Sequence, residues 1–155
     1  MSNRKVILIF LCVSLLIPII INATNASDLG IGITLVGIIA FPIWFLKSKK
    51  DQVPENFSFV FAITITGFYL AFIFMPMVTY WFINSYFPAI DIEGAFGFLL
   101  LGIILLAIFP LGPLHIFSTI VSIIYVFKNR SRKNWLALLI SILPILIFIL
   151  WMGLF

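Results

Sequence analysis

Long apolar runs without charge alternate with short charged clusters along this 155-residue chain, and this pattern constrains the fold more than any other feature. Only 9% of the residues are charged, whereas a soluble domain carries about 25%. A helix needs roughly 20 apolar residues to cross a hydrocarbon core about 30 Å thick. Runs such as 99–106 and 143–150 lack the alternating polarity of barrel strands. The sequence therefore predicts an all-α, polytopic membrane protein with a single transmembrane domain, 1–155.

Five membrane spans are predicted from the positions of the apolar runs, at about residues 6–21, 29–46, 57–83, 107–127 and 135–155. The stretch 94–127 is the hardest to divide, because its 34 residues make about 51 Å of helix, too long for one ordinary crossing. Two crossings would each be short and would place residues 128–133 outside. We therefore expect one crossing, preceded by an interfacial or re-entrant segment at 94–106, with Pro110 and Pro113 packed against neighbouring helices.

The basic residues predict the orientation of these spans. All nine Lys and Arg residues fall before the first span, after the second, or between the fourth and fifth. The remaining loops, around Asp28 and around Asp91 and Glu93, contain none. Because cytoplasmic loops carry an excess of Lys and Arg, we expect the N-terminus in the cytoplasm and the C-terminus outside, in the inner (plasma) membrane.

The first apolar segment has a second interpretation. Arg4 and Lys5 precede it and small polar residues 22–27 follow it, which also fits a cleaved signal peptide. Its apolar run is at the long end of the range for signal peptides, so we expect an uncleaved span. The single cysteine, Cys12, excludes an intrachain disulfide.

His115 is the candidate intramembrane polar site. A buried ionisable residue in a span is costly and is a functional hypothesis by default, such as a proton relay or a haem or metal ligand. No carboxylate or second histidine lies in any predicted span to complete a metal site, and we expect no cofactor. The alternative, which we favour, is a neutral histidine hydrogen-bonded to a carbonyl that Pro113 or Pro110 leaves free.

The densest basic cluster is a candidate contact for anionic lipid or for an acidic partner. A purely topological anchor is the simpler interpretation, and the two roles are compatible. The net charge of +4 is explained by cytoplasmic flanks, so no nucleic-acid partner is predicted. The cluster consists of Lys128, Arg130, Arg132 and Lys133.

Three functional hypotheses remain, and none is enzymatic, because no nucleophile lies beside a base and the loops are short. The first, which we rank highest, is an accessory or structural subunit that packs against other membrane protein subunits in the bilayer. The second is an immunity-type protein that blocks a membrane-inserting toxin. Small size, several spans and abundant Ile, Phe and Asn resemble bacteriocin-immunity proteins in general character, without a shared motif. The third is a small channel or transporter, but its polar row wraps around the third span: Thr64, Thr66, Tyr69 and Thr79.

Overall fold

The computed structural model describes residues 1–23, 28–87 and 95–154, except for the side chains of Leu29, Ile73, Met77, Phe148 and residues 95–109 and 151–154. The described residues form helices and no strands, as the sequence predicts. The elements are α1 (Asn3–Ala23), α2 (Asp28–Ser48), α3 (Phe57–Tyr69), the π-helical turn η1 (Leu70–Phe74), α4 (Met75–Tyr86), α5 (Ala95–Lys128) and α6 (Arg132–Leu154).

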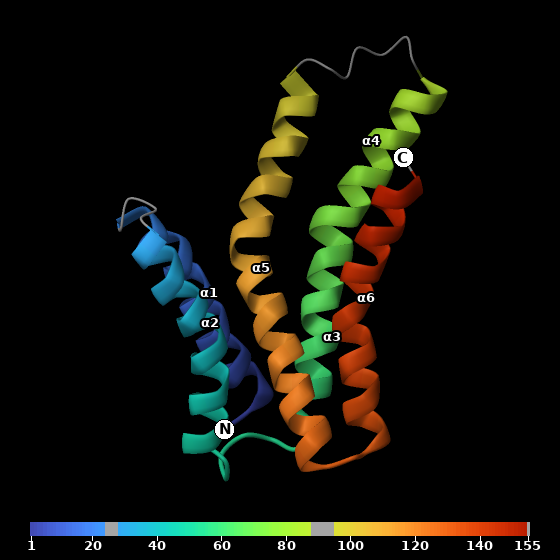
Figure 1. Ribbon diagram of the computed structural model, residues 1–155. Coiled ribbons are helices and arrows are strands. Elements are labelled where there is room, and N and C mark those ends of the chain that lie inside the picture. Colours follow the sequence, from blue (N-terminus) through green and yellow to red (C-terminus); the bar gives the residue numbers. More distant parts are fainter. Residues whose placement is uncertain (24–27, 88–94, 155) are drawn as a thin grey trace.

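Helix α5 is the centre of the bundle (Figure 1). It contacts α1 and α2 on one side and α3 and α6 on the other, while α2 contacts neither α3 nor α6 in the described part of the chain. The N-terminus, the loop 49–56 and the turn 129–131 all lie at the same end of the bundle. This end therefore gathers loops that are far apart in the sequence.

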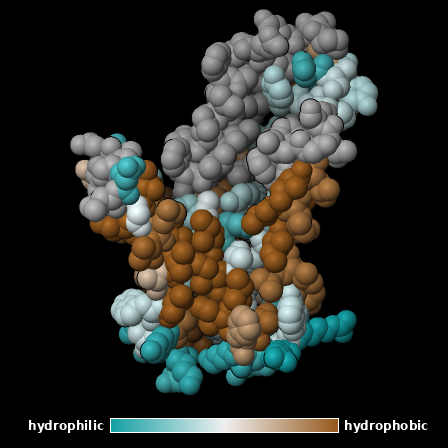
Figure 2. All heavy atoms as spheres, in the orientation of Figure 1, coloured by the Kyte–Doolittle hydropathy of each residue, from teal (hydrophilic) through white to brown (hydrophobic). Residues whose placement is uncertain are grey.

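Three helices are long and apolar enough to cross a membrane: Asn3–Ala23, Gly30–Ser48 and Pro110–Lys128. The apolar helical stretch Phe57–Phe72 is shorter than these three helices. Figure 2 shows hydrophobic residues over the middle of the bundle and hydrophilic residues at the end that carries the loops. These features support the membrane association that the sequence predicts.

Helix α5 differs from the expected division of residues 94–127. It continues as one helix from Ala95 to Lys128, past Pro110 and Pro113, with no break at residue 107. Each proline removes one backbone N–H donor, yet membrane helices tolerate this loss where neighbouring groups shelter the freed carbonyl. Both prolines are partly buried. The expected boundary between an interfacial segment and a crossing is therefore absent from the backbone.

The turn η1 joins α3 and α4 into one rod over residues 57–86. The amide of Met75 donates to the carbonyl of Leu70, which is the i to i+5 bond of a π-turn. Pro76 follows at once, and its ring would crowd a carbonyl in the preceding turn of a regular helix. A widened turn just before Pro76 accommodates that ring, so the predicted span 57–83 is one rod with a local irregularity.

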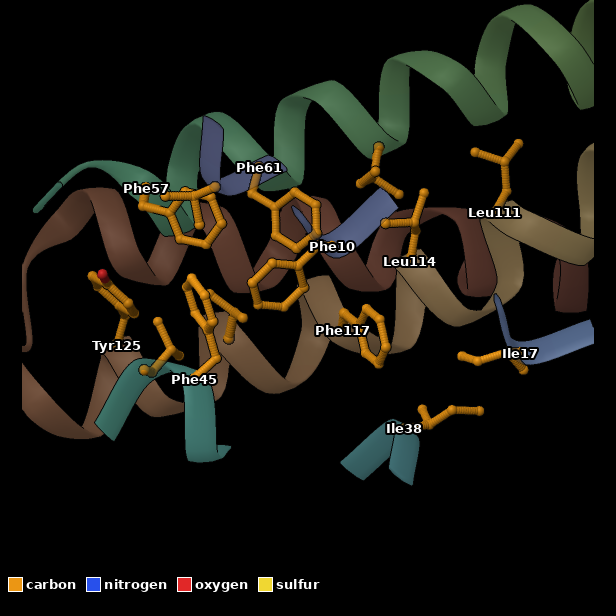
Figure 3. Packing of buried hydrophobic residues seen from close by; sticks show 14 residues of the cluster. Phe10, Ile17, Ile38, Phe45, Phe57, Phe61, Leu111, Leu114, Phe117 and Tyr125 are labelled. Carbon is orange, nitrogen blue, oxygen red and sulfur yellow. The ribbon is translucent and has the colours of Figure 1, made fainter. Parts of the chain in front are cut away.

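Phe10 of α1 lies at the centre of the core (Figure 3). It is fully buried, and five phenylalanine rings have centroids 5.2–5.9 Å from its own. Most of these pairs are edge-to-face, the arrangement that the charge distribution of aromatic rings favours. The five rings come from α2, α3 and α5, so one side chain of α1 joins four helices: they belong to Phe41, Phe45, Phe57, Phe61 and Phe117.

Candidate functional site

A line of buried polar side chains follows the contact between α3, α5 and α6. We call this line the polar seam. In a membrane, side-chain hydrogen bonds between helices replace part of the hydrophobic driving force that is missing there. The polar seam consists of Ser58 and Thr66 on α3, Ser118 and Ser122 on α5, and Asn134 and Ser141 on α6.

Asn134 closes the seam at the end that carries the loops. Its Oδ1 accepts a hydrogen bond from Ser58 Oγ at 2.9 Å. Its Nδ2 donates to the carbonyls of Tyr125 at 3.2 Å and Asn129 at 2.8 Å. One buried amide therefore holds α3, the end of α5 and the turn before α6 together.

The middle of the seam pairs hydroxyl groups across α5 and α6. The Oγ of Ser141 lies 3.0 Å from that of Ser118 and 3.3 Å from that of Ser122. These two α5 residues are four apart and so share one face of the helix. The sequence marks them as small residues suited to close packing, and the structure adds that their hydroxyls are bonded.

Thr66 supplies a hydrogen bond that Pro144 removes. A proline at position i cannot donate to the carbonyl of residue i−4, which here is Ile140. Thr66 Oγ1 of α3 donates to this carbonyl at 3.1 Å. The carbonyl that Pro144 leaves without a donor in α6 thus accepts a hydrogen bond from a neighbouring helix, as buried backbone in a membrane requires.

His115 lies one turn before Ser118 on α5 and differs from the rest of the buried polar groups. Its side chain is only 6% exposed, and neither ring nitrogen has a hydrogen-bond partner among the described residues. The predicted bond to a carbonyl freed by Pro110 or Pro113 is therefore wrong. The imidazole instead meets the ring of Tyr69 edge-on, with centroids 5.1 Å apart.

The described residues provide no ligand set around His115. Among the described residues, no group of three or more His, Cys, Asp and Glu side chains is arranged to hold a metal ion. Cys12 is a free, exposed thiol on α1. The acidic pair of the predicted outer loop, Asp91 and Glu93, lies outside the described residues.

The predicted basic cluster is exposed on and beside the turn between α5 and α6, and we call residues 128–133 the basic turn. No ion pair of the described chain involves its four cationic side chains. Lys128 Nζ lies 5.9 Å from the centroid of the Tyr125 ring, a cation–π distance. The structure also brings the other basic residues to the same end: Arg4, Lys5, Lys47, Lys49 and Lys50.

Comparison with known proteins returned no match: no protein-family model, no curated protein and no solved structure is similar to this chain.

Asn134 and Ser58, which are central to the polar seam, were not predicted from the sequence. Asn134 follows Lys133 directly and reads as a polar loop residue, while Ser58 stands at the start of an apolar run. Their pairing joins residues 76 positions apart, which no local pattern encodes. One signal was present for Thr66, because Pro144 predicts a free carbonyl at Ile140 that needs a donor from elsewhere.

Proposed function

We propose that the chain is a non-catalytic protein of the inner (plasma) membrane with five spans, its N-terminus in the cytoplasm and its C-terminus outside. The placement of all nine basic residues at one end of the bundle supports this orientation. The burial of Phe10 among rings from three other helices supports an uncleaved first span. On this topology α3, η1 and α4 together make one crossing, and α5 makes one long crossing.

We propose further that the protein is an accessory or structural subunit of a larger membrane complex. One observation carries this proposal: the buried polar side chains of the seam form hydrogen bonds across helices, to one another or, for Thr66, to a backbone carbonyl. The exposed side chains along the described helices are mostly apolar. The polar groups thus hold the bundle together and do not line a path for a solute. The surface that the protein presents to its surroundings is apolar.

Helix α2 is the face on which we expect the partner helix to pack. It contacts only α1 and α5 among the described elements, so much of its side is open. Gly37, Ala40 and Trp44 are exposed there at spacings that share one flank of the helix. Small residues let two membrane helices approach closely, and a side chain added at Gly37 would meet nothing within 4 Å.

The experiment is affinity purification of a tagged chain from its host membranes in a mild detergent, followed by mass spectrometry. We expect co-purifying membrane proteins in fixed stoichiometry. Gly37→Leu should lower their yield at least fivefold, because the leucine blocks a close helix contact while improving helix propensity. Gly67→Leu on α3 is the matched control, since a side chain there also meets nothing within 4 Å.

Three outcomes decide the proposal. Partners that survive Gly67→Leu and disappear with Gly37→Leu support it fully. If the partners are lost with Gly67→Leu alone, the subunit role stands but the partner helix does not pack on α2. A chain that purifies alone, or only with copies of itself, refutes the subunit role.

A further inference from the structure

We propose that the basic turn, together with the aromatic side chains at its two ends, binds the headgroup of an anionic phospholipid in the cytoplasmic leaflet. The proposal rests on the membrane placement given above and not on the subunit role. It names a specific place on the molecule, not the general attraction of a positively charged end for a negatively charged surface.

Unpaired charge is the first observation. Lys128, Arg130, Arg132 and Lys133 place four cations within six residues, and all four side chains are exposed. Two carboxylates, Asp51 and Glu55, lie at the same end of the bundle, yet no ion pair joins them to these cations among the described residues. The cations are therefore available to an anion from outside the chain, and Arg in particular binds phosphate oxygens in a bidentate manner.

Fixed geometry is the second observation. Asn134 holds the carbonyl of Asn129 at 2.8 Å, and the amide of Ser131 donates to the same carbonyl at 2.8 Å. The amide of Asn134 donates back to the carbonyl of Ser131 at 3.1 Å. Lys128 is drawn towards the ring of Tyr125. A turn that is already ordered loses little conformational entropy when it binds, which favours a defined site.

Apolar side chains at both ends of the turn identify the anion as a lipid. Phe127, the residue before the turn, is 82% exposed, and Trp135, just after it, is 49% exposed. Large exposed aromatic side chains beside cations fit a ligand that is anionic at one end and apolar at the other. An acidic segment of a soluble protein has the charge but not the acyl chains, so the phospholipid is the better match.

The second basic group of the same end provides a matched control. Lys47, Lys49 and Lys50 close α2, which does not contact α6, and Figure 1 shows the end of α2 apart from the turn between α5 and α6. Neutralising three cations in either place changes the net charge by the same amount. Only a local site distinguishes the two variants.

The test is native mass spectrometry of the purified full chain in detergent, titrated with phosphatidylglycerol or phosphatidylcholine. We expect phosphatidylglycerol to bind at least tenfold more tightly than phosphatidylcholine. The variant R130Q/R132Q/K133Q should weaken phosphatidylglycerol on the order of 100-fold, because each basic residue near an anionic headgroup contributes roughly a fivefold factor. The variant K47Q/K49Q/K50Q should weaken it less than tenfold.

Further arms separate the proposal from its alternatives. Phe127→Ala should weaken phosphatidylglycerol several-fold without changing the charge. Thermal unfolding verifies that each variant is folded, and Arg130→Gln alone, with an expected fivefold loss, replaces the triple variant if that one is not. Equal losses of phosphatidylglycerol affinity in the two triple variants would overturn the proposal, because the lipid would then respond to the overall positive charge of this end and not to a local site. Equal affinity for phosphatidylcholine, or displacement of the lipid by inorganic pyrophosphate or by an acidic peptide, would overturn it as well.

Discussion

Replacing Phe10 by alanine removes the ring at the centre of the core, and we expect this change to destabilise the protein by about 2–4 kcal/mol. In soluble cores a buried Phe→Ala change costs about 3–5 kcal/mol, part of which is transfer from water. A helix that unfolds within lipid keeps its phenylalanine in an apolar medium, so the transfer part shrinks and the packing part remains. That part is large here, because Phe10 is fully buried against five rings.

The assay is unfolding by sodium dodecyl sulfate in mixed micelles, followed by tryptophan fluorescence. Leu8→Ala is the matched control, since Leu8 lies on the same helix and is 59% exposed. We expect the control to cost less than about 0.5 kcal/mol, as surface substitutions usually do. Equal unfolding midpoints for the two variants would refute the reasoning, because α1 would then not contribute its buried face to the bundle.

Three further substitutions test the buried polar groups by the same unfolding assay. Thr66→Val should lower the free energy of unfolding by about 1–2 kcal/mol. The loss should be smaller in a Pro144→Ala background, because residue 144 then regains an N–H that can donate to the Ile140 carbonyl. Equal losses in the two backgrounds would contradict this pairing. Asn134→Ala removes three side-chain hydrogen bonds and should cost about 2–4 kcal/mol, whereas a cost below about 1 kcal/mol would show that the amide does not join α3 to the turn. His115→Leu should raise the free energy of unfolding by about 1–2 kcal/mol, because both ring nitrogens are buried without partners in the described part of the chain. A loss of stability would show that they are bonded.

The positions of the helices follow closely from the sequence because lipid imposes a simple constraint. An apolar run of sufficient length has to be helical in a membrane, and clusters such as 47–50 and 128–133 are too polar to enter it. The start of α2 at Asp28 and the end of α5 at Lys128 therefore lie within a residue of the predicted span limits. The helical class of the fold is readable for the same reason.

The internal geometry does not follow from the sequence, because it depends on neighbours. The length of residues 94–127 suggested a division near residue 107, yet α5 runs past that point and through Pro110 and Pro113 as one helix. His115 was expected to use a carbonyl freed by one of these prolines, but its ring faces Tyr69 instead. Whether a freed carbonyl is met by its own helix or by another is decided by tertiary packing, which a local pattern does not contain.

Membrane topology mapping tests the central claim most directly, using single cysteines in a Cys12→Ala background and a maleimide that does not cross membranes. The last turns of α1 and α4, which would carry Asn22→Cys and Ser85→Cys, lie towards one end of the bundle. The loop 49–56 and the turn 129–131, which would carry Gln52→Cys and Asn129→Cys, lie at the other end. In intact cells we expect labelling of the first pair and of a cysteine added after Phe155, and labelling of the second pair only after permeabilisation. Labelling of Gln52→Cys or Asn129→Cys in intact cells, or protection of the added C-terminal cysteine, would contradict five spans with a cytoplasmic N-terminus.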